Sequence, residues 1–156
     1  MKPHNPVTRT HSHILLTLVL VSVAGCGGEQ PLAASPEIPS IAGTWTFNAS
    51  NLSGGGFSCD AFAYRLSVNQ SGTTFTGSYS DGTIRCTEDG KTFEVGPGLT
   101  GTIVNGTVTE SGSVGFDLDT QDFHQTGTVS GDSMSGTATW RFDFTGILSG
   151  SWTASR

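Results

Sequence analysis

The chain has 156 residues, of which 13% are charged and 35% hydrophobic, and it carries 22 glycines and a formal net charge of −6. A chain of this length has room for one small domain beyond a leader segment. Its acidic balance argues against binding to nucleic acid and against electrostatic attraction to anionic lipid. The composition is that of an acidic globular domain.

The first residues have the composition of a secretory signal. Lys2 and Arg9 precede an apolar run from Ile14 to Val23, and small residues follow that run. About ten apolar residues are too few for a helix that must cross roughly 30 Å of hydrocarbon, so a transmembrane anchor is not expected.

The residues Val23-Ala24-Gly25-Cys26 resemble a bacterial lipobox, the processing site of exported lipoproteins. The resemblance implies cleavage before Cys26, attachment of a diacylglycerol to its thiol and acylation of the new amino group. Two or more acyl chains anchor a protein stably where one does not, so Cys26 is predicted to be a membrane tether. The alternative is cleavage near Ala24 by ordinary signal peptidase, which leaves a soluble secreted protein with Cys26 as a free thiol.

These observations divide the chain into a signal peptide over 1–25, a lipidated cysteine with a flexible, proline-punctuated linker over 26–40, and one domain over 41–156. Loss of the leader removes Lys2 and Arg9, so 5 basic residues remain against 13 acidic ones, a net charge of about −8. The residue after Cys26 is Gly27 and not the Asp that would resemble an inner-membrane retention signal. We therefore expect a lipid-anchored protein of the bacterial envelope, at the outer membrane and facing the periplasm or the cell surface.

Three cysteines are an odd number for an exported chain, and lipidation of Cys26 leaves the pair Cys59 and Cys86. Export permits a disulfide between them, with Cα atoms about 4.4 to 6.8 Å apart. The alternative is two unrelated free thiols. No metal ligand set and no cofactor are predicted from the cysteines.

The domain over 41–156 alternates between apolar and polar residues with the period of two that is typical of β-strands with one buried face. The apolar series are Ile41, Trp45, Phe47 and Ala49; Phe62, Tyr64, Leu66 and Val68; Phe75 and Tyr79; Val114, Phe116 and Leu118; Ala138, Trp140, Phe142 and Phe144; Leu148, Trp152 and Ala154. Glycine, threonine and serine stand where helix-forming residues would be needed. The sequence therefore predicts an all-β domain.

Turn signals join these strands as hairpins. Ser71-Gly72, Asp81-Gly82, Asn105-Gly106 and Gly131-Asp132 are each predicted to be two-residue turns. A turn at Ser71-Gly72 places Tyr64 opposite Tyr79, and it places Cys59 and Cys86 on the opposite face of the ladder as diagonal neighbours. A loop at Thr145-Gly146-Ile147 sets Trp140 opposite Trp152.

A loose internal repeat, S-G-x-x-(apolar)-x-G, begins at Ser71 and again at Ser130. Its last glycine, Gly77 or Gly136, suits a strand that coils sharply or that lies under a neighbouring side chain. Hairpins that each have one apolar face must bury those faces together, and closure also removes exposed sheet edges. We therefore predict a single up-and-down antiparallel barrel of about eight strands.

Gly43-Thr44-Trp45 resembles the G-x-W motif of the calycins, the group of up-and-down barrels that includes the lipocalins and avidin. The resemblance implies that Trp45 plugs one end of the barrel and that a basic residue from the last strand packs over it. Arg156 is the first candidate for that residue and Arg141 the second. Fold alone does not carry function, so no ligand is transferred from this group.

The segment from Asp117 to His124 contains Asp117, Asp119, Asp122 and one histidine, residue types that can hold a cation. Its spacing lacks the glycine and closing glutamate of an EF-hand loop, and one histidine does not make a typical zinc site. We interpret it as a solvated strand end, with a weak cation site as the alternative. No G-x-S-x-G elbow accompanies this histidine, so an enzyme is not expected.

Two functions fit these residues. In the first, the barrel binds a small apolar or amphipathic ligand among Trp45, Tyr64, Tyr79, Trp140 and Trp152. In the second, the same residues fill the barrel, and the protein is a structural or protein-interaction lipoprotein of the envelope. The oligomeric state and the identity of a ligand or protein partner are not readable from the sequence.

Overall fold

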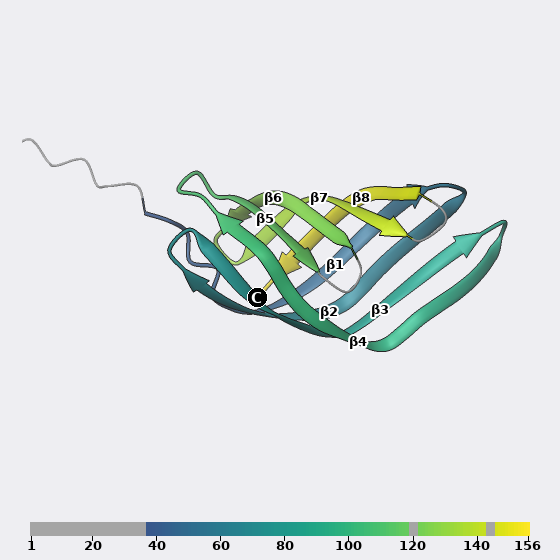
Figure 1. Ribbon diagram of the computed structural model, residues 1–156, viewed down its shortest axis with the longest axis horizontal. Helices are drawn as coiled ribbons and strands as arrows, with labels where there is room; N and C mark the ends of the chain where they lie inside the picture. The colour runs from purple at the N-terminus through teal and green to yellow at the C-terminus, as the bar shows by residue number, and fades with distance from the viewer. Residues whose placement is uncertain (1–36, 119–121, 143–145) are drawn as a thin grey trace, which may run out of the picture. The chain divides into compact units, whose positions relative to one another are not determined.

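The computed structural model describes residues 37–118, 122–142 and 146–156. The predicted leader, Cys26 and most of the linker lie outside the described residues. The described residues form eight antiparallel strands in a closed barrel, which confirms the predicted all-β, up-and-down architecture (Figure 1). Within them, no helix is long and apolar enough to cross a membrane.

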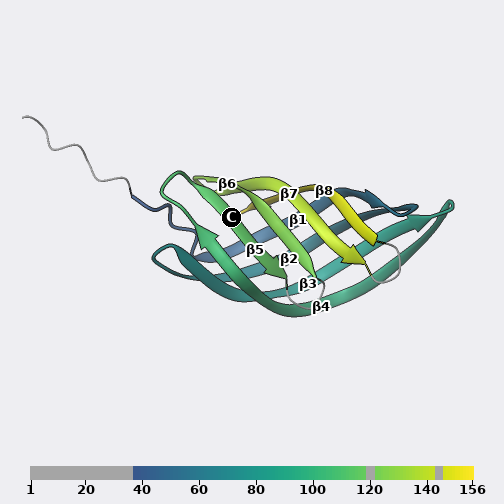
Figure 2. The same cartoon turned by 45° about the horizontal axis from the view of Figure 1, so that its top comes forward.

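The strands follow one another around the barrel in chain order, and β1 pairs with β8 to close it. Their bounds are β1 Gly43–Gly54, β2 Phe57–Ser71, β3 Thr74–Glu88, β4 Lys91–Val108, β5 Ser113–Leu118, β6 Phe123–Ser130, β7 Ser133–Phe142 and β8 Gly146–Ser155. We call the end that holds residues 37–42 the floor and the opposite end the mouth. At the mouth, the β3–β4 hairpin projects beyond the other strands (Figures 1 and 2).

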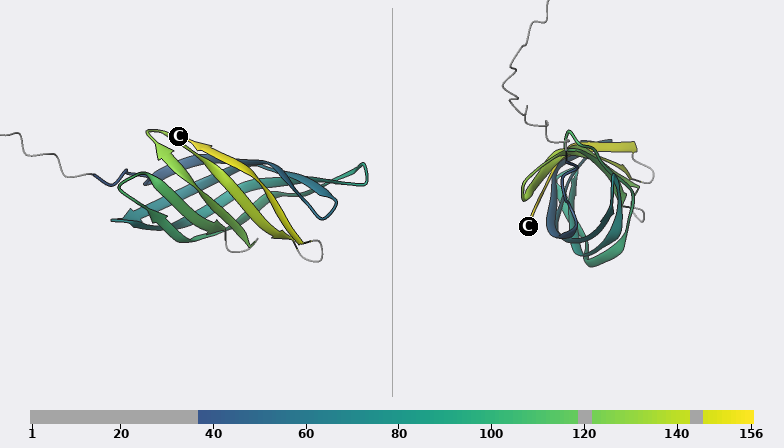
Figure 3. Two further views of the ribbon diagram at one scale, coloured as in Figure 1. Left: turned by 90° about the horizontal axis from the view of Figure 1, so that it is seen from above. Right: turned by 90° about the vertical axis from the view of Figure 1, so that its left-hand side faces the viewer.

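Viewed along the barrel, the strands enclose an oval cross-section (Figure 3). Among the described residues, 27 buried hydrophobic ones form a single cluster that lines the interior. Most of them come from the alternating series that predicted the strands, because every second residue of a barrel strand points inward. The core of the domain is therefore the inside of the barrel.

Two of the four predicted hairpin turns are wrong. Asp81-Gly82 and Asn105-Gly106 lie inside the continuous strands β3 and β4. Asp81 and Asn105 do adopt the left-handed conformation that a turn would need, with φ of 62° and 54°. Here that conformation bends a long strand, as a β-bulge does, and does not reverse the chain.

The turn between β2 and β3 lies one residue later than predicted. Ser71 pairs with Thr74, so Gly72 and Thr73 form the turn, and every pair in the ladder shifts by two positions. Tyr79 therefore lies opposite Leu66 and not opposite Tyr64. The turn at Gly131-Asp132 is confirmed by the pairing of Ser130 with Ser133.

The same shift places Cys59 directly opposite Cys86, and the two form a disulfide with an S–S distance of 2.04 Å. The disulfide prediction is confirmed, but the predicted diagonal arrangement is wrong. The Cα atoms are 4.0 Å apart, below the predicted range of about 4.4 to 6.8 Å.

Both cysteines face the interior. Uninterrupted alternation had predicted instead that they lie on the outer face. Ala63 in β2 and Asp81 in β3 have φ of 61° and 62°, and the order of inward and outward residues reverses at both positions. Cys59 is therefore 1% exposed and Cys86 is fully buried. The reversal also turns Phe62 outward, where the Arg85 guanidinium lies 5.3 Å from the ring centroid.

Candidate functional site

The predicted ligand residues all lie inside the barrel, on five different strands. Trp45 is on β1, Tyr64 on β2, Tyr79 on β3, Trp140 on β7 and Trp152 on β8. Trp45 and Tyr64 are fully buried, Tyr79 and Trp152 are 1% exposed, and Trp140 is 6% exposed. Alternation along each strand positions these side chains, because each belongs to the inward-facing series of its strand.

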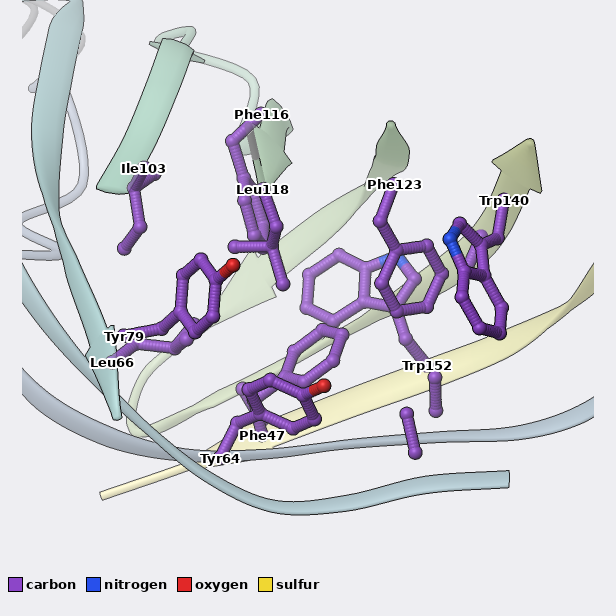
Figure 4. Packing of buried hydrophobic residues seen from close by; sticks show 14 of the residues in the cluster. Phe47, Tyr64, Leu66, Tyr79, Ile103, Phe116, Leu118, Phe123, Trp140 and Trp152 are labelled. Carbon is purple, nitrogen blue, oxygen red and sulfur yellow. The ribbon is translucent and has the colours of Figure 1, made fainter. Parts of the chain in front are cut away.

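Most of the interior aromatic side chains form one continuous network (Figure 4). Phe47 lies at its centre, with ring centroids 6.0 Å from Tyr64, 6.2 Å from Phe123 and 5.7 Å from Trp152. A further contact of 6.3 Å joins Phe47 to Phe116. Separations of this size are those of aromatic rings in direct contact.

The network extends toward β3 through Tyr64 and Tyr79, whose ring centroids are 5.5 Å apart. It extends toward β7 through Phe123 and Trp140, at 5.9 Å. Four of the five predicted ligand residues are thus connected through rings that the sequence reasoning did not select. Phe47 belonged to an alternating series and Phe123 to none, and alternation does not show which inward residues meet at the centre.

The predicted pairing of Trp140 with Trp152 is wrong. Trp140 lies opposite Leu148, and Trp152 lies opposite Gly136. Gly146 already belongs to β8, so the loop between β7 and β8 is displaced from the predicted position, and Phe144 lies outside the described residues. Because Gly136 has no side chain, the indole of Trp152 reaches across β7 at this position. Its Nε1 donates to the carbonyl oxygen of Thr126 on β6 at 3.0 Å.

One interior polar side chain was missed by the sequence reasoning. Gln125 on β6 is fully buried. Oriented to satisfy its surroundings, its amide nitrogen donates to the carbonyl oxygens of Phe123 and Phe116, at 3.0 and 3.1 Å. The signal that could have found it is its spacing, because Gln125 lies two residues after Phe123 and so shares its face of the strand. These hydrogen bonds offset the cost of burying the amide, so it is a satisfied core group.

Glycines provide the space in which the interior rings lie. A Cβ atom at Gly82 would be 2.2 Å from the Tyr64 ring, and one at Gly101 would be 2.5 Å from the Tyr79 hydroxyl. The repeat glycines Gly77 and Gly136 instead meet backbone, with carbonyl oxygens of the neighbouring strand 2.0 and 1.9 Å from the Cβ position. At all four positions, a side chain would displace a ring or a strand.

We expect Gly82→Ala to lower the free energy of unfolding by about 1 to 3 kcal/mol, because the Tyr64 ring must move into a packed core. Gly115→Ala is the matched control, since a Cβ there lies at an ordinary 3.6 Å from its nearest neighbours. Urea unfolding of both variants measures the difference. Equal stability of the two variants would contradict the packing of Tyr64 over Gly82.

The floor is closed by Trp45, Arg156 and residues 39–42. The Arg156 guanidinium carbon lies 4.5 Å from the Trp45 ring centroid. Its nitrogens donate to the carbonyl oxygens of Ala42 and Ser40 at 3.0 and 3.2 Å and to the Asp132 carboxylate at 2.7 Å. From the other side, the Gln70 amide accepts from the Ile41 amide nitrogen at 2.6 Å.

Arg141, the second candidate for this position, lies elsewhere. It forms an exposed ion pair with Asp122 at 2.7 Å. Ile41 is fully buried, and the Trp45 Nε1 donates to its carbonyl oxygen at 2.8 Å. The residues that follow the linker are thus part of the folded barrel.

The acidic segment lies on the outer wall. Asp117 on β5 pairs directly with His124 on β6, and its carboxylate contacts the His124 Nδ1 and accepts from the Asn105 Nδ2 at 2.7 Å. Asp119 lies outside the described residues. Among the residues that the structure describes, no three His, Cys, Asp or Glu side chains are grouped to hold a metal ion.

Together, the fold and the interior define a small eight-stranded up-and-down β-barrel with an aromatic interior and a side chain–backbone clasp at one end. In comparisons with known proteins, no protein-family model, curated protein or solved structure matches this chain. The function is therefore argued from the geometry of this barrel.

Proposed function

We propose that this chain is a lipid-anchored envelope protein whose barrel is filled by its own side chains and acts through its outer surface, as a structural or protein-interaction module. The observation that carries this proposal is the aromatic network. Phe47 contacts four other rings at 5.7 to 6.3 Å, and the large side chains around it are buried. Rings that already fill each other's contact surface occupy the space that an apolar ligand would need.

Ligand binding in the interior is the competing function, and it requires the network to open. Separating Phe47 from its partners would sacrifice aromatic contacts worth about 0.5 to 1.5 kcal/mol per pair beyond the buried area. A ligand would also have to pass the mouth, where the disulfide between Cys59 and Cys86 points into the barrel and is buried. Both features favour the filled barrel.

The experiment that separates the two functions is native mass spectrometry of the mature protein, purified from membranes in a mild non-ionic detergent. We expect only the mass of the lipidated chain. A stoichiometric apolar molecule that remains bound after detergent removal and is released on unfolding would contradict the filled barrel.

The anchor in this proposal rests on the lipobox-like residues that end at Cys26. Glycine after the cysteine favours the outer membrane as the destination. The calycin-like likeness is part of the same proposal, and it is supported by the position of Trp45 under Arg156 at the floor. We draw from it only the architecture, because barrels of this kind carry many functions.

We expect Cys26→Ala to release the protein from membranes or to block its processing. Without the thiol there is no site for the diacylglycerol, and each lost acyl methylene removes about 0.8 kcal/mol of membrane binding. Detergent phase partitioning of the parent and the variant measures the change, with Ser53→Ala, an exposed β1 position, as control. If the cysteine variant partitions like the parent, lipidation at this residue is wrong.

A further inference from the structure

The outer wall formed by β6, β7, β8 and β1 carries an ordered array of short polar side chains. The four strands pair in register, so their outward residues line up in rows that cross them. The first row contains Asn48, Thr153, Ser135 and Thr128. The second row contains Thr46, Ser155, Ser133 and Ser130. All eight side chains are exposed, and none is ionisable.

The two rows line a groove of about 270 Å³. Met134 and Ala154, which lie between the rows, also border the groove, but both are buried members of the interior cluster. Serine and threonine side chains are short, so the wall stays hollow where longer side chains would fill it. The groove is close in size to the roughly 300 to 1,000 Å³ of typical small-molecule sites. It therefore offers a concave, uncharged surface on the outside of a filled barrel.

The chemistry of the lining selects the ligand. Each hydroxyl both donates and accepts hydrogen bonds, whereas a charged ligand would lose water without meeting an opposite charge. Arg156 and Asp132 stand beside the groove, but they pair with each other at 2.7 Å. Threonine methyl groups add apolar patches of the kind that can pack against the C–H face of a sugar ring.

We propose that this groove binds a neutral saccharide chain, a ligand whose hydroxyls and C–H faces match the lining. The inference rests on the proposed function, because a filled barrel must recognise its partner on the outer wall. It goes beyond the structural or protein-interaction role proposed above, because it assigns to the outer wall an uncharged glycan and names the four strands that contact it. Asn48 has a second task, because its Oδ1 accepts from the Ala63 amide nitrogen at 3.1 Å, so the test uses other residues.

The test compares two variants that place the same side chain on opposite parts of the wall. Thr153→Glu puts a charge and extra bulk in the middle of the first row, and Thr76→Glu makes the same change on the exposed face of β3, outside the groove. The probes are the neutral tetrasaccharides chitotetraose, cellotetraose and maltotetraose. Each is titrated into the mature lipidated protein in detergent and followed by saturation-transfer difference NMR and calorimetry.

We expect at least one tetrasaccharide to bind the parent protein, and Thr153→Glu to weaken that binding about tenfold, the effect of losing one or two hydrogen bonds. Thr76→Glu should change it by less than about twofold, as a distant surface change does. Urea unfolding confirms that both variants are folded. No binding of any tetrasaccharide at about 10 mM, above the range of weak specific affinity, or equal binding by both variants, overturns the proposal.

Native mass spectrometry keeps this result separate from the fate of the proposed function. A ligand found inside the barrel would contradict the filled barrel, but the effect of Thr153→Glu on saccharide binding could still be measured. Conversely, if the mass spectrum shows only the lipidated chain and no saccharide binds, the glycan proposal is wrong and the filled barrel stands.

Discussion

Truncation of Trp45 to alanine is expected to lower the free energy of unfolding by about 3 to 5 kcal/mol, the usual range for an aromatic side chain removed from a core. Trp45 is fully buried, and the Arg156 guanidinium carbon lies 4.5 Å from the centroid of its ring. Its loss leaves the carbonyl oxygen of Ile41 without the Nε1 donor that it now has at 2.8 Å. For a small domain, this is a large part of the total stability.

Two further variants divide that effect into its parts. Trp45→Phe keeps most of the buried ring and loses the indole donor, so it should cost less than the alanine variant. Arg156→Gln removes the cation over the indole, a contact worth roughly 1 to 2 kcal/mol when partly desolvated. Urea unfolding followed by far-ultraviolet circular dichroism measures all three, and a loss below about 1 kcal/mol for Trp45→Ala would be typical of a surface position and incompatible with a closed floor.

The sequence was sufficient for the barrel because alternation and hairpin turns act locally. In β1, β5 and β8, the side chains that point inward are those that the period of two selects, such as Trp45, Phe116 and Trp152. Each strand could bury only one face, and joining the faces required closure. Closure and the up-and-down order of the strands follow from these local signals, whereas the exact number of strands does not.

Register was less predictable because it depends on where a strand bends. Asp81-Gly82 and Asn105-Gly106 are favourable turn sequences, yet their left-handed residues serve as bends inside β3 and β4. Asparagine and aspartate tolerate this conformation in either setting, so the dipeptide cannot distinguish a turn from a bulge. Ala63 gives no signal at all, since its positive φ is held by a hydrogen bond from its amide nitrogen to Asn48 on the neighbouring strand.

The candidate site shows the same limit. Inward residues such as Tyr64 and Trp140 were identifiable, but the contacts that join them through Phe47 and Phe123 depend on strands that are far apart in the sequence. The groove on the outer wall is likewise a product of register, because its rows contain one residue from each of four strands. In the sequence, those residues are ordinary outward serines and threonines.

The second large effect concerns the disulfide between Cys59 and Cys86. Replacing both cysteines by alanine should lower the free energy of unfolding by about 3.6 kcal/mol, the chain-entropy value for a loop of about 28 residues. The bond joins positions 27 apart in the sequence, so the unfolded chain gains this freedom when the bond is absent. Reduction of the parent protein should produce nearly the same loss, whereas the double alanine variant should be insensitive to reductant.

The disulfide also holds the mouth of the folded barrel, because both cysteines lie at that end. Cys59 and Cys86 lie on the inner face, beyond the positive-φ residues Ala63 and Asp81 that turn both strands over. Opening the bond should therefore loosen the mouth before the floor, where Trp45 and Arg156 remain paired. Hydrogen exchange of the reduced protein should show faster exchange of amides in 57–61 and 84–88 than in 41–47, since local stability varies across a fold. Uniform loss of protection in both regions, or reactive thiols at both cysteines in the unfolded but unreduced protein, would show that the bond does not hold the mouth.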